Sequence, residues 1–200
     1  MSLKKSFLII LLILIVDQWS KIYIKTHFTL RESITVFSWF KILFVENKGM
    51  AWGVELPGNY GKLSLTLFRL VAISGIGYWL WDSTRKKEHP ILLVSIAFIF
   101  AGALGNIIDS VWYGLIFSKS TMTQIATLFP EVGYEKLFYG RVVDMIQLPM
   151  IDTILPNWIP FGYGGQRFTF FDPVFNIADS AISIGVGLLI LFNKTVFPNK

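Results

Sequence analysis

The chain has 200 residues, of which 54% are hydrophobic and only 16% are charged. Soluble domains carry about a quarter charged residues, so this composition indicates an integral membrane protein. Cysteine is absent, which excludes disulfides and thiolate metal sites, and the two histidines, His27 and His89, show no metal-ligand spacing. The net charge of +5 is spread over short basic clusters without a basic stripe, which indicates membrane topology and not nucleic-acid binding.

The first apolar run begins at Phe7 and ends at Val16, after a short basic start. A cleaved signal peptide has the same pattern. No small-residue cleavage site follows, however, and apolar residues resume after Lys21. We therefore expect a retained membrane helix over residues 6–24.

The next stretch, residues 28–60, differs in character. Residues 33–37 and 40–45 are β-branched and aromatic, which predicts short strands, and glycine-containing turns follow at 47–53 and 57–59. We expect a small sheet on the membrane surface.

Three further apolar runs predict helices over residues 63–82, 91–113 and 176–193, each near the ~20 residues that a span needs. Residues 114–173 form a long mixed stretch before the last run. The expected fold is a mainly α integral membrane domain over residues 1–200. It has four transmembrane helices, a small extracytoplasmic β-sheet and a long extracytoplasmic insertion before the last helix.

Short basic clusters lie at alternate ends of the four runs, so all of them fall on one side, the cytoplasm by the positive-inside rule. These clusters are Lys4 and Lys5, residues 85–87, and Lys194 and Lys200. Both termini are then cytoplasmic. At ~1.5 Å per residue, the polar residues of helices 1, 3 and 4 reach the outer part of the bilayer.

Those polar residues have helical spacing. Asn106 and Asp109 share one helix face, as do Asn176 and Asp179. Asp17 and Lys21 are four apart and can pair. Each has a plainer interpretation: a structural ion pair for Asp17 and Lys21, hydrogen bonds between helices for Asn106 and Asp109, and a solvated helix start for Asp179.

Asp144 stands between apolar pairs, Val142-Val143 and Met145-Ile146, outside the four runs. We expect Asp144 to be partly buried at the membrane face; a solvated surface turn is the alternative. Two aspartates in a poorly solvated place share a proton, so that one serves as base and the other as acid. Such a pair can activate water and protonate the leaving nitrogen of an amide. No Gly-x-Ser-x-Gly or His-Glu-x-x-His motif is present, which disfavours the common serine and zinc hydrolases.

Five motifs in order resemble the bacterial lipoprotein signal peptidases, or signal peptidase II. They are residues 17–21, 47–53, 102–109, 142–146 and 175–180. The resemblance implies a membrane aspartyl endopeptidase that cleaves a diacylglyceryl prolipoprotein before its lipidated cysteine and is inhibited by globomycin. It implies a bacterial cytoplasmic (inner) membrane protein with its active site near the extracytoplasmic surface. We expect no cofactor or metal, a monomer, and membrane lipid and the prolipoprotein as partners.

The resemblance also implies roles for individual residues. Asp144 and Asp179 would be the catalytic pair. The supporting and substrate-binding positions would be Asp17, Lys21, Asn47, Gly49, Asn106, Asp109, Arg141 and Asn176.

The sequence departs from the family pattern in three places. Ser110 stands where the family usually has arginine, and Arg141 or Arg167 is a candidate substitute. The family's Ala-Ala-Phe-Gly is replaced by residues 50–53, Met-Ala-Trp-Gly. Residues 114–139 and 147–172 look like insertions, which could form a lid or an interfacial helix.

Other functions remain open at this point. A proton-coupled transporter would also place aspartates in the membrane, although near its midplane and often with repeated helix pairs. A lipid-phosphate hydrolase would want more basic residues than Lys21, Lys48 and Arg141 supply. A purely structural protein does not account for acids at one depth.

Overall fold

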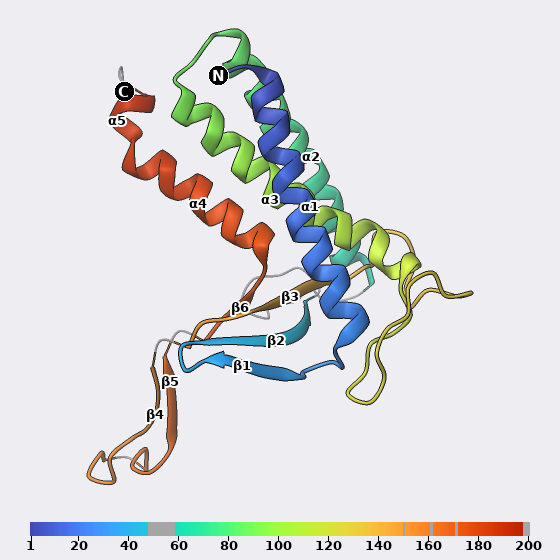
Figure 1. The fold of residues 1–200 in the computed structure, drawn as a ribbon, viewed down its shortest axis with the longest axis vertical. Coiled ribbons are helices and arrows are strands. Elements are labelled where there is room, and N and C mark those ends of the chain that lie inside the picture. Colours follow the sequence, from blue (N-terminus) through green and yellow to red (C-terminus); the bar gives the residue numbers. More distant parts are fainter. Residues whose placement is uncertain (48–58, 150, 161, 171, 198–200) are drawn as a thin grey trace.

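Four long helices lie side by side in the computed structural model, which describes residues 1–47, 59–149, 151–160, 162–170 and 172–197. Their bounds are α1 Leu3–His27, α2 Asn59–Arg85, α3 Pro90–Ile116 and α4 Ile177–Leu191, and a short helix α5, Asn193–Val196, follows. Both termini lie at one end of the bundle and a sheet lies across the other end (Figure 1).

Three helices are long and apolar enough to cross a membrane: α1, α3 and the Gly61–Arg85 part of α2. All three begin earlier and end later than the predicted apolar runs: α1 and α2 continue into polar residues at their ends, and α3 continues through Gly114, Leu115 and Ile116. α4 is equally apolar but has only 15 residues. It starts at Asn176, whose side chain caps it, and α3 starts with a proline at its first position, where the missing N–H costs nothing.

The main sheet is antiparallel, with strand order β1-β2-β3-β6. Its strands are β1 Ser33–Phe37, β2 Phe40–Asn47, β3 Val142–Gln147 and β6 Val174–Phe175. The sequence predicted strands only within residues 28–60. The structure adds β3, which lies within the mixed stretch 114–173, and β6, which follows directly after that stretch; β3 pairs with β2 and β6 pairs with β3.

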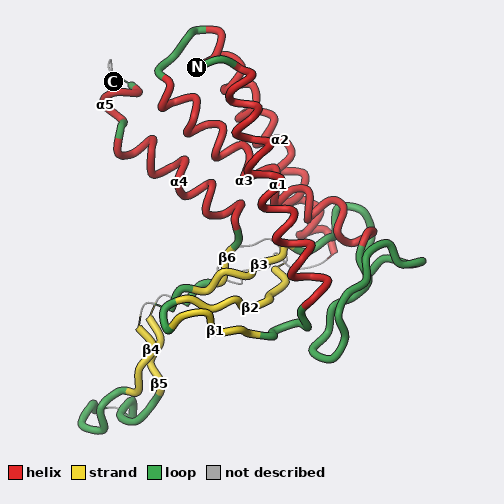
Figure 2. The backbone as a smooth tube through the Cα atoms, viewed as in Figure 1, coloured by secondary structure: helices red, strands yellow, loops and turns green. Residues whose placement is uncertain are grey.

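Residues 114–116 of the first insertion continue α3, and the other described residues of the two insertions contain no helix, so the expectation of a separate interfacial helix was wrong. Residues 151–170 include a separate hairpin, β4 Ile151–Ile154 with β5 Arg167–Phe170, which projects away from the main sheet (Figure 2). Residues 117–141 form a collar without regular structure. Its amides bond to carbonyls in the last turns of α3, including Glu135 N to Gly114 O at 2.9 Å and Gly140 N to Ser110 O at 2.9 Å.

α3 is the central helix, and α4 packs closely against it. A Cβ atom built on Gly102 would lie 2.2 Å from the Ala178 carbonyl oxygen, and one on Gly185 would lie 2.7 Å from the Ser95 carbonyl oxygen. Small residues therefore bring the two backbones together, as is common between membrane helices. This contact places the start of α4 beside the middle of α3, where the polar residues lie.

Candidate functional site

A fully buried cation lies between two buried carboxylates from different helices. Lys21 Nζ is 2.9 Å from Asp17 Oδ2 on the same helix and 2.9 Å from Asp109 Oδ2 on α3. Its third partner is Asn106 Oδ1, also at 2.9 Å. An ammonium group has three hydrogens, and here each has an acceptor, as burial of a charge requires.

Gln18 completes this ion cluster, although the sequence interpretation did not single it out. Its side-chain amide nitrogen donates to Asp17 Oδ2 at 3.0 Å and to Asp109 Oδ1 at 2.9 Å, and its oxygen accepts from Tyr113 OH at 3.2 Å. The available signal was a polar amide between two charged residues of an apolar helix. Asp17 also accepts from the backbone N–H of Ala178 at 2.9 Å, which ties α1 to the first turn of α4.

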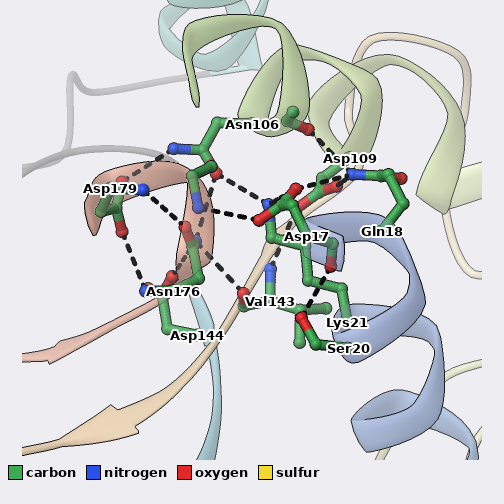
Figure 3. A network of polar contacts seen from close by, with 12 residues as sticks. Asp17, Gln18, Ser20, Lys21, Asn106, Asp109, Val143, Asp144, Asn176 and Asp179 are labelled. Carbon is green, nitrogen blue, oxygen red and sulfur yellow. Dashed lines mark hydrogen bonds and ion pairs between the residues drawn. The ribbon is translucent and has the colours of Figure 1, made fainter. Parts of the chain in front are cut away.

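The Lys21 ammonium orients Asn106. Because an ammonium only donates, the Asn106 oxygen must face Lys21 and its nitrogen must point the other way. That nitrogen donates to Asp179 Oδ1 at 2.8 Å. The buried ion cluster is therefore connected to Asp179 through one amide (Figure 3).

Asn176 connects the two candidate catalytic aspartates. Its side-chain oxygen accepts from Asp179 N at 2.9 Å, and Asp179 Oδ2 accepts in return from Asn176 N at 3.2 Å, which forms a capping box at the start of α4. The Asn176 side-chain nitrogen donates to Asp144 Oδ1 at 2.7 Å. Figure 3 shows Asn176 between Asp144 and Asp179, and a dashed line that joins Asn106 to Asp179.

The two aspartates have opposite surroundings. Asp179 lies in the first turn of α4, where the helix dipole and two N–H donors stabilise a negative charge. Asp144 lies on β3 and is almost fully buried. Burial and, secondarily, the nearby Asp179 charge raise the pKa of Asp144 to about 7, against opposing hydrogen bonds from Asn176 and Asn47. Burial therefore favours the neutral carboxylic acid form of Asp144 more than it would be favoured in an exposed aspartate.

The remaining predicted positions lie in several places. Asn47, at the end of β2, hydrogen-bonds to Asp144. Arg141 Nη1 is 3.3 Å from Glu46 Oε2, so the partner that the structure gives it is Glu46. Ser110, which stands where arginine was expected, donates to the Asn106 carbonyl of its own helix at 3.0 Å. Gly49, the 50–53 segment and the side chain of Arg167 lie outside the described residues.

A second buried ion pair, Lys25 on α1 with Glu46 on β2, was not predicted. Lys25 also donates to Ser120 Oγ at 3.1 Å and lies 4.8 Å from the ring centre of Tyr134. Arg141 joins this group through Glu46. The pair links α1, β2 and the collar, and β2 is the strand that pairs with β3, which carries Asp144.

No cluster of metal-ligand side chains occurs among the residues that the structure describes. The arrangement has two carboxyl groups in different surroundings and two asparagine amides that orient them. A buried lysine fixes one of these amides. It is suited to activation of a water molecule and protonation of a leaving group.

A family model described as signal peptidase (SPase) II matches residues 9–194. The chain belongs to the signal peptidase II family. This result confirms the resemblance drawn from the sequence motifs and makes the chain a peptidase. Its three long apolar helices make this signal peptidase II a membrane protein.

Named relatives agree with this assignment. A lipoprotein signal peptidase of Porphyromonas gingivalis is 51% identical over 191 residues, which cover 94% of this chain and 82% of the relative. One from Amoebophilus asiaticus is 34% identical over 94% of this chain and 76% of its own length. A solved bacterial membrane enzyme, 27% identical, superposes with a TM-score of 0.64 over 99% of this chain and 93% of that one. The fold of that membrane enzyme is therefore shared over nearly all of this chain.

Proposed function

We propose that this chain removes the signal peptide from diacylglyceryl-modified prolipoproteins by aspartyl catalysis and cleaves just before the lipidated cysteine. Asp144 and Asp179 are the catalytic pair in this proposal. The observation that carries it is the double contact of Asn176 with both acids, together with the pKa of Asp144 near 7. Family membership and the names of the relatives support the substrate class.

In the proposed reaction, ionised Asp179 accepts a proton from a water molecule placed between the acids. The resulting hydroxide attacks the scissile carbonyl carbon. Asp144 then gives its proton to the amide nitrogen as the C–N bond breaks. One proton moves from Asp179 back to Asp144 before the next cycle, so the pair ends as it began.

The other polar residues hold this pair in place. Asn106 and Asn176 orient the Asp179 carboxylate, and Lys21 fixes Asn106. Asp17 and Asp109 neutralise the charge of Lys21, and Gln18 donates hydrogen bonds to both carboxylates. Asn47 donates to Asp144. In this proposal these residues position the acids and do not react.

The proposed topology has four crossings of the bacterial inner membrane, with both termini cytoplasmic. Both termini lie at the end of the bundle opposite the sheet (Figure 1), which supports an even number of crossings. The basic residues of the 85–87 turn lie at that same end. The acids lie at the sheet end, at the depth where a doubly acylated cysteine would present its peptide bond. A carrier would instead place its acids near the midplane.

The test is cleavage of a synthetic diacylglyceryl prolipoprotein by purified enzyme. Asp144→Asn and Asp179→Asn should each lower turnover by about 10²–10⁴-fold, the range of general acid–base catalysis. Asp172→Asn is the matched control, because Asp172 is exposed and bonds Gln147 at the surface. Normal turnover by either of the first two variants would remove that residue from the mechanism.

A further inference from the structure

The collar after α3 folds back along the end of that helix. Ser118 N donates to Thr127 O at 3.0 Å, and Phe129 N donates to Ile116 O at 2.8 Å. A Cβ atom on Gly133 would lie 2.7 Å from Leu115 Cα. The segment from 127 to 133 therefore lies beside the last turn of α3, which is also the end of a candidate membrane span.

The turn of this segment presents apolar side chains outward. Phe129 is 75% exposed and Val132 is 81% exposed, and Leu128 beside them is also exposed. Phe129 has a backbone φ of +53°, a left-handed conformation that is uncommon for a bulky residue, and it is held there by its bond to Ile116. Backbone strain of this kind occurs preferentially at functional segments, where the surrounding structure holds it.

The same apolar surface continues onto the helix. Trp112 and Leu115, in the last turns of α3, are exposed on the span itself. Aromatic residues gather where a span meets the headgroup region. The collar turn adds apolar side chains beside this part of the span. Continuity with a span surface favours lipid as the occupant.

We propose that the collar turn Leu128–Val132 is an interfacial membrane anchor that inserts Phe129 and Val132 into the lipid boundary beside α3. From this anchor the chain runs to Gly140, which bonds to the Ser110 carbonyl of α3, and then enters β3. Asp144 is on that strand. Resting on the proposed function, the anchor fixes the depth of the strand that carries the candidate acid.

The chain has no cysteine, so single nitroxide labels can be placed without background. Phe129→Cys, Val132→Cys and the control Gln124→Cys are each labelled in the full-length protein, in vesicles of phosphatidylethanolamine and phosphatidylglycerol. Gln124 is exposed in the other turn of the same collar. Collision rates are then measured with oxygen, which concentrates in lipid, and with a water-soluble nickel chelate.

The ratio of oxygen to nickel collisions should be several-fold higher at 129 and 132 than at 124. Equal ratios at the three positions would overturn the proposal, as would labels at 129 and 132 that neither reagent reaches, because those would face protein. Because positions 129 and 132 are exposed, labelling there should leave the melting temperature unchanged, which checks folding. If one of the two variants does not fold, the other still provides the test. The spectroscopic outcome does not depend on peptidase activity, so it can fail while the proposed function stands.

Discussion

At the scale of single residues, two asparagines determine how the acids are placed. In each, the side-chain oxygen accepts from one group and the side-chain nitrogen donates to an aspartate. The Asn106 oxygen accepts from Lys21 and its nitrogen donates to Asp179. The Asn176 oxygen accepts from the backbone N–H of Asp179 and its nitrogen donates to Asp144. An amide can do this because it donates from one atom and accepts at the other. A carboxylate at either position could not donate, and an apolar residue would leave the acids free to rotate.

The pH dependence of cleavage should follow Asp144. Its pKa is raised to about 7 by burial and by the Asp179 charge, so the group carries its proton below pH 7 and loses it above. The active pair holds one proton. We therefore expect kcat/KM to fall above about pH 7, by about tenfold for each further unit. The measurement is kcat/KM for the lipidated substrate between pH 5 and 9, and a flat profile to pH 9 would contradict the assignment.

Substitution of Asn47 should shift the pH profile of cleavage in a direction that can be predicted. Its hydrogen bond favours the ionised form of Asp144, so Asn47→Ala should raise the Asp144 pKa further and move the alkaline limb to higher pH. Titration belongs to the pair of acids, so the limb is read as an apparent value. Asp172→Asn, remote from the pair, should leave the limb in place. A limb that moves to lower pH in Asn47→Ala would show that Asn47 does not act on the charged form.

Removal of the central cation should be more costly than removal of a surface charge. Lys21→Met leaves Asp17 and Asp109 buried and uncompensated, which typically costs about 3–5 kcal/mol. Adding Asp109→Asn to Lys21→Met should recover part of that loss, because one of the buried charges is gone. Thermal unfolding in detergent measures both. If the double variant is less stable than Lys21→Met, repulsion between the carboxylates is not the cause.

Contacts between residues close together in the chain could be predicted from the sequence, whereas contacts between distant residues could not. The pairs within one helix, such as Asp17 with Lys21, could be predicted because helical spacing is local. The burial of Asp144 was expected from its apolar neighbours and is confirmed. The contacts that bury it could not be derived from those neighbours, because they depend on β3 pairing with β2 and on Asn176 at the start of α4. Lys25 and Glu46 were missed for the same reason: nothing near either residue in the chain indicates the other.

At the scale of elements, the α3–α4 contact depends on absent side chains. Gly102→Ala should lower both stability and turnover, because the new methyl group would lie 2.2 Å from the Ala178 carbonyl oxygen and would push the start of α4 away. Gly187→Ala is the matched control on α4, since no atom lies within 4 Å of that Cβ position. It should be neutral or stabilising by up to about 1 kcal/mol, the helical preference for alanine. Melting temperature and turnover are compared, and equal effects would mean that close packing is unimportant.

The Lys25–Glu46 pair is expected to hold the sheet in position below α1. Lys25→Met would leave Glu46 buried with Arg141 as its remaining ion-pair partner among the described residues, and loss of one member of a buried pair typically costs about 3–5 kcal/mol. Lys86→Met is the control, because Lys86 pairs with Asp82 at the surface, where ion pairs contribute little. Unfolding measurements should show a large loss only for Lys25→Met. A similar small loss for both would indicate that water enters the Lys25 cluster.

The helices and strands differ in how well their local sequence predicts them. Long apolar runs define α1, α2 and α3, because backbone bonds of a helix are local and lipid requires them to be satisfied. Strands β1 and β2 are neighbours joined by a short turn, and their β-branched pattern was sufficient to predict them. β3 and β6 are short, and β3 needs β2, about a hundred residues earlier, as a partner. The collar takes its form from the free carbonyls of α3, which no local pattern shows.

At the scale of the whole molecule, the number of membrane crossings depends on α4. Its 15 residues rise about 22 Å, less than the ~30 Å hydrocarbon thickness, although α5 continues close behind it. The sheet end and the end with both termini are opposite one another (Figure 1). Four crossings therefore place the exposed residues Lys87 and Lys194 on one side and Trp158 of the hairpin on the other.

Single cysteines in the cysteine-free chain test this arrangement directly. Lys87→Cys, Lys194→Cys and Trp158→Cys are exposed to a membrane-impermeant maleimide in right-side-out vesicles, before and after permeabilisation. With four crossings, Trp158→Cys should react in intact vesicles, whereas the two lysine positions should react only after permeabilisation. With three crossings, α4 would lie on the outer surface and Lys194→Cys would react together with Trp158→Cys. That result would require Asp179 to start a surface helix, and the pair of acids would then meet lipid-linked substrate outside the bilayer.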